Sequence, residues 1–219
     1  MTTHDFDSPA FVDAYDELPL WSAMFGQVLL EHVPLRAGTT ALDVGCGSGF
    51  PLLELAQRLG PGSAVYGLDP WLAALRRAER KRRQWGVRHA MLHAGDAARM
   101  PFRDASFDLV VSNLGLNNFA DPQTSLRECR RVLRRRGVLA LTTNLVGHMH
   151  ELYDVFAEVV GERSRLDAHI HHRATIESLH ALLAGTGFTI VRVVEDAFVM
   201  RYASASALFS SVSFRTTSP

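Results

Sequence analysis

Three glycines at alternating positions give the chain its most informative spacing. Gly45, Gly47 and Gly49 lie between a Val- and Leu-rich segment and an amphipathic one. Glycine permits tight backbone angles and lets a ligand approach the backbone closely. A turn that joins a strand to a helix is also where open α/β sheets bind nucleosides. We therefore expect a nucleoside site here, the alternative being a tight connection that holds no ligand.

An acidic residue follows the last of these glycines by twenty positions. Asp69 ends a second apolar run, and its carboxylate would accept hydrogen bonds from the ribose hydroxyls of a bound nucleoside. A dinucleotide fingerprint would need glycine at position 50, where the chain has Phe50. Because a dinucleotide rests its pyrophosphate on the helix N-terminus, the missing glycine favours a nucleoside without phosphate. Asp43 is placed to satisfy an ammonium group on such a ligand.

Apolar runs alternate with longer amphipathic stretches from residue 41 onward, as in βα units built on a parallel sheet. The predicted strands are Ala41–Gly45, Ala64–Asp69, Arg88–Ala94, Asp108–Asn113, Val138–Asn144 and Phe188–Val194. The predicted helices are Pro51–Leu59, Trp71–Trp85, Pro122–Arg136 and Thr175–Thr186. The inward face of the third helix is expected to hold Leu126, Cys129, Val132 and Leu133. Gly137 is expected to end that helix.

The resulting fold class is a Rossmann-like, doubly wound α/β domain with helices on both faces of a mostly parallel sheet of six or seven strands. At 219 residues and 47% hydrophobic content, a single domain is the default. Its expected parts are a helical N-terminal cap (1–38), a ligand-binding core (39–146), an insertion with a helix at Glu151–Gly161 (147–173) and the C-terminal part of the sheet (174–219). A seventh strand around Val212–Arg215 is left open. Without it, a second copy could cover the exposed edge in a homodimer.

Five segments resemble, in order and in spacing, the class I S-adenosylmethionine-dependent methyltransferases. They are Leu42–Gly49, Gly67–Pro70, Gly95–Ala97, Phe107–Asn113 and the helical pair Leu126–Glu128 with Arg131–Leu133. The resemblance covers roughly residues 41–144 and is closest to the small-molecule branch that includes ubiquinone and menaquinone biosynthesis enzymes. One departure is Arg135–Gly137, which stands where the family often has Pro-Gly-Gly.

This resemblance implies S-adenosylmethionine as the cofactor and S-adenosylhomocysteine as the product. The glycines would line the methionine half of the cofactor, Asp69 would hold the ribose, and Pro70 and Trp71 would pack on adenine. Asp96 would accept from the adenine amino group, although an Asp after Gly also often caps a turn. The full set of implied cofactor residues is Asp43, Gly45, Cys46, Gly47, Gly49, Asp69, Pro70, Trp71, Asp96, Ala97, Asn113 and Leu114.

Methyl transfer is an in-line displacement in which the protein aligns the reactants and excludes water. A hydroxyl or an acidic carbon as acceptor would benefit from a base, and His148, ahead of His150, is the candidate. A surface or helix-capping histidine is the alternative. The small-molecule acceptor is expected between the cap and the insertion, where the candidate contacts are Tyr15, Trp21, Asn117, Asn118, Asn144 and Tyr153. The aromatic residues among these could equally be packing.

Nucleic acid is not an expected partner. Amino-methylating nucleic-acid enzymes usually carry Asn/Asp-Pro-Pro-aromatic where this chain has Asn113–Leu116. Lys plus Arg total 23 and Asp plus Glu total 23, so no global field attracts a polyanion or an anionic membrane. The basic runs Arg76–Arg83 and Arg127–Arg136 fit solvated helix faces. An RNA methyltransferase and a non-catalytic S-adenosylmethionine-binding protein remain as alternatives.

The remaining composition points to a cytoplasmic protein without a metal. Two cysteines are too few for a disulfide framework, Met1–Pro9 lacks the features of a secretory signal, and no apolar window is long enough to span a membrane. The histidines have neither the helical spacing nor the carboxylate and cysteine neighbours of a metal site. No metal is therefore expected.

Overall fold

A parallel sheet of five strands forms the centre of the computed structural model, which describes residues 5–17, 20–160 and 173–210. The strands are β1 (Thr40–Val44), β2 (Ala64–Asp69), β3 (Ala90–Ala94), β4 (Phe107–Asn113) and β5 (Leu133–Thr142). Their order in the sheet is β3-β2-β1-β4-β5, and every neighbouring pair is parallel. The prediction of a Rossmann-like parallel sheet is confirmed, with five strands in the described ranges.

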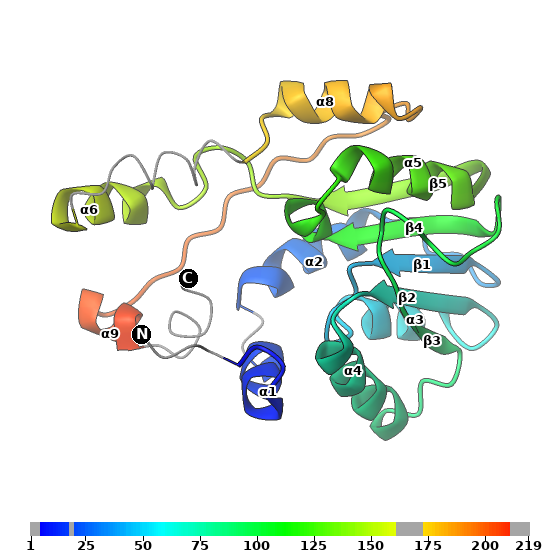
Figure 1. Ribbon diagram of the computed structural model, residues 1–219, viewed down its shortest axis with the longest axis horizontal. Helices are drawn as coiled ribbons and strands as arrows, with labels where there is room; N and C mark the ends of the chain where they lie inside the picture. Colours follow the sequence, from blue (N-terminus) through cyan, green and yellow to red (C-terminus); the bar gives the residue numbers. More distant parts are fainter. Residues whose placement is uncertain (1–4, 18–19, 161–172, 211–219) are drawn as a thin grey trace.

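Helices precede the sheet, connect its strands and follow it (Figure 1). They are α1 (Pro9–Glu17), α2 (Leu20–His32), α3 (Leu52–Leu59), α4 (Leu72–Gln84), the short 3-10 helix η1 (Gly115–Asn118), α5 (Pro122–Val132), α6 (His150–Val160), α8 (Ile176–Gly185) and α9 (Ala205–Ser210). The strand arrowheads point toward the side of the molecule where α1, α6 and α9 lie. No helix within the described ranges is both long and apolar enough to cross a membrane.

Successive side chains of a strand point to opposite sides of the sheet. Helices pack against both of these sides and form two cores. On β4, Leu109 and Val111 enter a core shared with α2 and α3, whereas Val110 enters a second core shared with α5. The predicted inward face of the third helix is confirmed for Leu126, Cys129 and Val132 of α5, which are buried; Leu133 is buried as well but lies just beyond the helix. These two cores hold the carboxyl ends of the strands in a fixed arrangement.

The predicted end of the third helix is wrong. This helix, α5, ends at Val132 rather than at Arg136, and β5 begins at Leu133. Leu133 is 3% exposed and pairs with Phe107 on β4, so burial at the second core and sheet pairing outweigh continuation of the helix. Gly137 therefore lies inside a strand and does not stop the helix.

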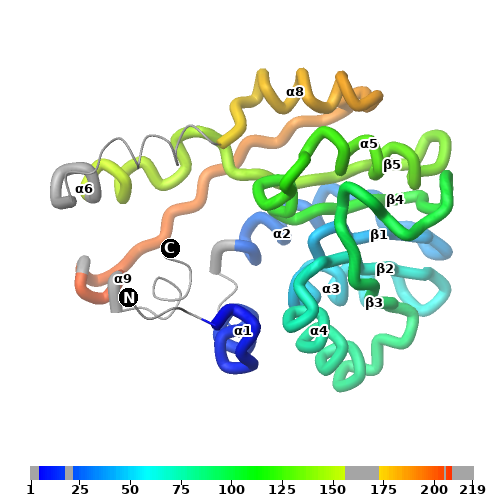
Figure 2. Tube along the Cα trace, in the orientation of Figure 1, coloured from blue at the N-terminus to red at the C-terminus, as the bar shows by residue number. Residues whose placement is uncertain are grey.

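The predicted sixth strand, Phe188–Val194, is also wrong. Phe188 packs against the second core, but the segment that follows forms no strand. It runs from α8 to α9 (Figure 2), and its Phe198 ring lies 5.6 Å from that of Phe25 between centroids. Val191 is 89% exposed there. A β-branched run becomes a strand only where it pairs with another strand, and this segment pairs with no strand of the sheet. The proposed seventh strand at 212–215 lies outside the described residues.

Candidate functional site

The glycine-rich turn follows β1 directly, and each of its glycines has a left-handed backbone. The backbone N–H groups of Gly45 and Cys46 donate to the carbonyl oxygen of Leu68, which fixes the turn against the end of β2. A Cβ on Gly49 would lie 3.1 Å from the Cβ of Ala78, whereas a Cβ on Gly47 would meet nothing within 4 Å. Gly49 thus permits close helix packing, and Gly47 faces open space. Cys46 is buried as a whole residue, so its side chain is part of the core beneath the turn.

Asp69 joins the turn to the end of β2. Its Oδ2 accepts from the backbone N–H of Gly47 at 2.8 Å, and its Oδ1 accepts from that of Trp71 at 2.8 Å. Burial raises the pKa of the Asp69 carboxyl, although the two N–H donors act to lower it. Each carboxylate oxygen keeps a second lone pair for another donor. The fold therefore brings together the glycines and the acidic residue singled out by their spacing.

Asp43 is a buried carboxyl group at the same place. Its side chain is 0% exposed and its two oxygens lack a hydrogen-bond partner in the described part of the chain. The backbone N–H of Leu52 lies near enough to lower its pKa somewhat, but burial and then the charge of Asp69 raise the pKa to about 8. A buried acceptor without a donor is costly. A ligand that brings a cationic donor to this turn would relieve that cost.

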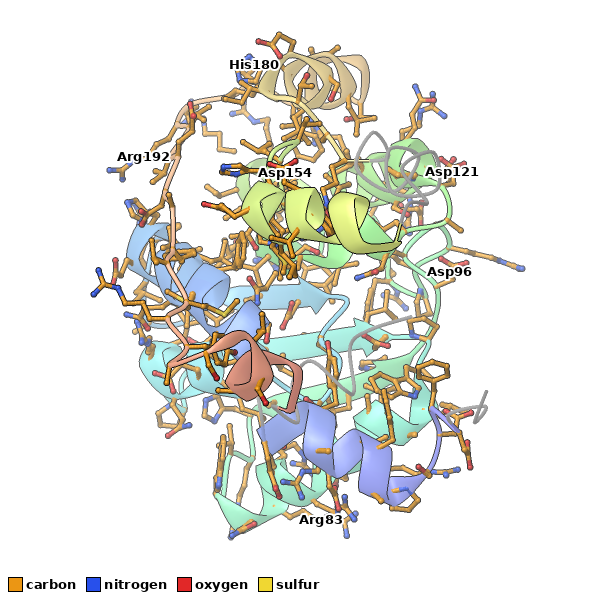
Figure 3. The ribbon with its side chains drawn as sticks, turned by 90° about the vertical axis from the view of Figure 1, so that its left-hand side faces the viewer. Arg83, Asp96, Asp121, Asp154, His180 and Arg192 are labelled. Atoms are coloured by element: carbon orange, nitrogen blue, oxygen red, sulfur yellow. The ribbon has the colours of Figure 1, made fainter. Side chains whose placement is uncertain are left out.

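The residues after β2 and β3 border the same edge of the sheet. The Trp71 ring lies beside those of Phe11 and Tyr15 of α1, at 6.4 and 5.4 Å between centroids. The Oδ1 of Asp96 accepts from the backbone N–H of Ala98, which is the turn-capping role considered for it. Figure 3 views the molecule from this side, with Asp96 labelled near one margin and α1 at the bottom. Ala97 is buried and Pro70 is exposed.

Asn113, at the end of β4, is held from two sides. Its Nδ2 donates to the carbonyl oxygen of Ser22 on α2 at 2.9 Å, and its Oδ1 accepts from the Thr142 hydroxyl at 2.7 Å. Leu114 then adopts a left-handed backbone with φ 59°. Its backbone N–H donates to the carbonyl and the hydroxyl oxygens of Thr142, and these bonds hold the strained conformation. Sequence reasoning missed Ser22 and Thr142; register could have revealed Thr142, since parallel pairing sets it opposite Asn113.

Some of the candidate acceptor residues lie together near the carboxyl ends of β4 and β5, and others do not. Asn117 accepts from the Thr143 hydroxyl, and the Nδ2 of Asn118 donates to the carbonyl oxygen of Leu114 at 3.4 Å. The Oδ1 of Asn144 is buried without a hydrogen-bond partner in the described residues. Tyr15 lies elsewhere, against Trp71, and the side chain of Trp21 is outside what the structure describes.

His148 lies beside α2, after the end of β5. Its ring is 6.1 Å from that of Phe25, and its carbonyl oxygen accepts from Arg173, which also donates to the Tyr153 hydroxyl. Burial and then the positive charge of Arg173 lower the pKa of His148 to about 4. His150 is exposed beside Glu151. Of the two histidines, His148 is the one held in a defined, half-buried position.

Comparison with known proteins decides the family. Residues 42–141 match the family described as methyltransferase domain. This stretch is a methyltransferase domain. It runs from within β1 to near the end of β5 and includes the glycine-rich turn, Asp69 and Asn113.

Relatives of the methyltransferase domain include a demethylmenaquinone methyltransferase from Anoxybacillus flavithermus, 36% identical over 135 residues that make up 60% of this chain and 57% of the relative. A malonyl-[acyl-carrier protein] O-methyltransferase from Halorhodospira halophila is 31% identical over 200 residues, which are 90% of this chain and 64% of the relative. The chain spans about half the length of the demethylmenaquinone methyltransferases it matches.

A solved structure has the same fold as most of this chain. The SAM-dependent methyltransferase from Aquifex aeolicus aligns with a TM-score of 0.67, covering 86% of this chain and 92% of that one at 20% identity.

No group of three or more His, Cys, Asp or Glu suited to a metal ion occurs among the described residues.

Proposed function

We propose that this chain binds S-adenosylmethionine at the carboxyl ends of β1, β2 and β4 and transfers its methyl group to a small apolar acceptor, leaving S-adenosylhomocysteine. The observation that carries the proposal is the buried, unpartnered carboxyl group of Asp43 beside a turn whose Gly47 is bonded to Asp69. A ligand with an ammonium group and a ribose satisfies both carboxyl groups at once. The match of residues 42–141 to the methyltransferase domain family supports the same cofactor.

Different residues at this edge of the sheet would contact different parts of the cofactor. Gly47, with open space above its Cα, lets the backbone approach the methionine half of the cofactor, and Asp43 faces the ammonium. Asp69 accepts the ribose hydroxyls with its free lone pairs. Pro70 and Trp71 pack on adenine, while Asp96 and Ala97 contact its edge. The bound cofactor supplies a methyl group on positively charged sulfur, beside Asn113 and Leu114.

The acceptor belongs, on this proposal, to the quinone class or to similar apolar rings with an ionisable hydroxyl. The name of the Anoxybacillus relative supports this choice. Asn117, Asn118 and Asn144 would border the acceptor from the carboxyl ends of β4 and β5. The N-terminal helices and the segment after β5, including Trp21 and Tyr153, would close the remaining sides. The protein aligns acceptor and methyl group and excludes water, which is most of what this displacement needs.

His148 is proposed as the base for a hydroxyl or acidic-carbon acceptor. With a pKa near 4 it is neutral at physiological pH, the form that can accept a proton, and as a weak base it suits only an acceptor whose proton is already acidic. Its ring contact with Phe25 of α2 supports this role, since Ser22 of the same helix accepts from Asn113 beside the proposed methyl group.

The first experiment measures thermal stability with S-adenosylmethionine, S-adenosylhomocysteine and NAD in parallel. A ligand at a hundred times its Kd adds about 2.7 kcal/mol, so we expect a clear rise in Tm with both sulfur nucleosides and none with NAD. Methyl transfer is then followed by mass spectrometry with a demethylmenaquinol-type acceptor, a malonyl thioester and RNA. Transfer to the malonyl thioester, and not to the quinol, would contradict the quinone class and favour an acceptor like that named for the Halorhodospira relative.

Two finer proposals accompany this function. The outer edge of β5 has no strand beside it in the described ranges, and we propose that a second copy covers it in a homodimer. Sedimentation of the purified chain tests this. A cytoplasmic location stays a prediction from the sequence.

A further inference from the structure

The helix α1 lies beside α4, which comes much later in the chain (Figure 1). Pairs of opposite charge join the two helices. Arg80 reaches Asp13 at 2.7 Å, and Arg77 reaches Asp13 at 3.3 Å and Asp16 at 2.8 Å. Lys81 also pairs with Asp16. Part of the basic face that the sequence assigned to solvent is therefore covered by α1.

Asp16 is at the centre of this arrangement. Its side chain is only 6% exposed, and that of its partner Lys81 is 14% exposed. Burial acts to raise the pKa of Asp16, but hydrogen bonds from Lys81, Ser48 and Arg77 outweigh it and lower the pKa. Ser48 belongs to the glycine-rich turn. Asp16 thus links α1 both to α4 and to the turn that faces the cofactor.

Aromatic contacts place α1 over the same site. The Trp71 indole N–H donates to the Asp7 carboxylate just before α1, and its ring packs edge-on against Tyr15. The Tyr15 phenol has a raised pKa because it is partly buried and near the negative charges of Asp69 and Asp16. The Tyr15 side chain therefore packs against Trp71 and lies within electrostatic reach of Asp69, the residues proposed for adenine and ribose.

We propose that α1 is a cover over the nucleoside end of the cofactor site, held closed by the Asp13 and Asp16 pairs with Arg77, Arg80 and Lys81, and that Asp16 is the positioning residue that sets how long the nucleoside stays bound. This inference rests on the proposed function. It moves Tyr15 from the acceptor side to the cofactor side. An adenosyl ligand beneath Tyr15 leaves only when the charged pairs open, so salt and loss of Asp16 speed its release.

The test compares wild type, Asp16→Asn and the control Glu79→Gln, a carboxylate of α4 that pairs only with Arg82 and Arg83 of its own helix among the contacts described. Release of S-adenosylhomocysteine is followed by stopped-flow fluorescence. Hydrogen exchange of the α1 amides is measured without ligand. We expect Asp16→Asn to release the nucleoside about tenfold faster, as for a lost charge-assisted hydrogen bond. Raising salt should speed wild-type release and affect Asp16→Asn less, because screening shortens the reach of charge.

Three outcomes are distinguishable. Faster release and faster α1 exchange in Asp16→Asn alone support the cover. Faster α1 exchange with unchanged release shows that the pairs anchor a helix but do not control the site, and overturns the inference. If wild type binds no S-adenosylhomocysteine, the proposed function fails and the cofactor role of α1 fails with it, whatever hydrogen exchange shows about the pairs.

Discussion

The Oδ2 atom of Asp69 accepts the backbone N–H of Gly47 at 2.8 Å, across a separation of 22 residues. This bond ties the carboxyl end of β2 to the turn after β1. It also aims the carboxylate along the open face of the turn, because the second oxygen is bound to the backbone of Trp71. The ribose and methionine ends of a cofactor would thus meet one rigid unit.

Replacing Asp69 with Asn should weaken S-adenosylmethionine binding by at least about tenfold, since an amide loses the charged acceptor for the ribose hydroxyls. Titration calorimetry measures the Kd. The exposed carboxylate of Asp104 provides the matched control, Asp104→Asn, which should bind normally. Equal affinities for wild type and Asp69→Asn would contradict the assigned ribose contact.

Two glycine substitutions should separate binding from folding. Gly47→Ala places a methyl group in open space above the turn, at a cost to stability of about 1–2 kcal/mol for the left-handed backbone, and should abolish cofactor binding. Gly49→Ala adds to that cost a contact at 3.1 Å with Ala78, so it should lower Tm further. Thermal melts and calorimetry on both variants check this order. Tight binding by Gly47→Ala would place the cofactor elsewhere.

Asp43 should make the ligand-free protein less stable as pH rises. Its pKa is about 8 in the folded state and near 4 when unfolded, so between these values the folded state holds a proton that the unfolded state releases. Stability then falls with rising pH through this window, by up to about 1.4 kcal/mol for each pH unit from this group. Asp43→Asn should remove that slope, which melts of both proteins from pH 5 to 9 measure. Parallel curves for the two proteins would rule out the raised pKa.

The same group predicts the pH dependence of cofactor affinity. An ammonium ligand favours the ionised carboxylate, so S-adenosylmethionine should bind more tightly to wild type as pH approaches 8. Asp43→Asn should bind weakly and with little change over this range. A wild-type Kd that is constant from pH 6 to 8 would show that the ammonium does not meet Asp43.

His148→Gln should lower kcat about 100-fold if this residue is the base, without changing the Kd for the cofactor. Because burial and Arg173 hold the pKa of His148 near 4, the wild-type rate should persist down to about pH 5 before falling. The exposed His150 supplies the control substitution, His150→Gln. Undiminished turnover by His148→Gln would end the proposal of a base at this position.

The strands and the cofactor half of the site were predictable because their signals are local. Short apolar runs that end in Gly, Asp or Asn gave β1, β2 and β4 to within a residue or so. Parallel topology then brings Asp43 and Asp69 to one edge. The end of α5 was not predictable, because Arg134 suits an outward helix face as well as an edge strand. Only the distant pairing of Leu133 with Phe107 decides between them.

The proposed acceptor side was less predictable, because the contacts of its residues join segments far apart in the sequence. Ser22 reaches Asn113 across 91 residues, and no local pattern marks it. The ion pairs on the charged face of α4 could not be predicted from local sequence either. Arg77 looks like a solvent residue from helical spacing alone, and only the position of α1 reveals its partners.

The contact between α2 and Asn113 uses a backbone carbonyl, that of Ser22, which every amino acid possesses. Mutations along α2 can therefore alter the side chains proposed to border an acceptor without removing the hydrogen bond between this helix and β4. Phe25, one turn farther along α2, packs against His148 and takes no part in the hydrogen bond to Asn113. Descendants of this chain could acquire new acceptors by drift at such positions while the cofactor half stays unchanged.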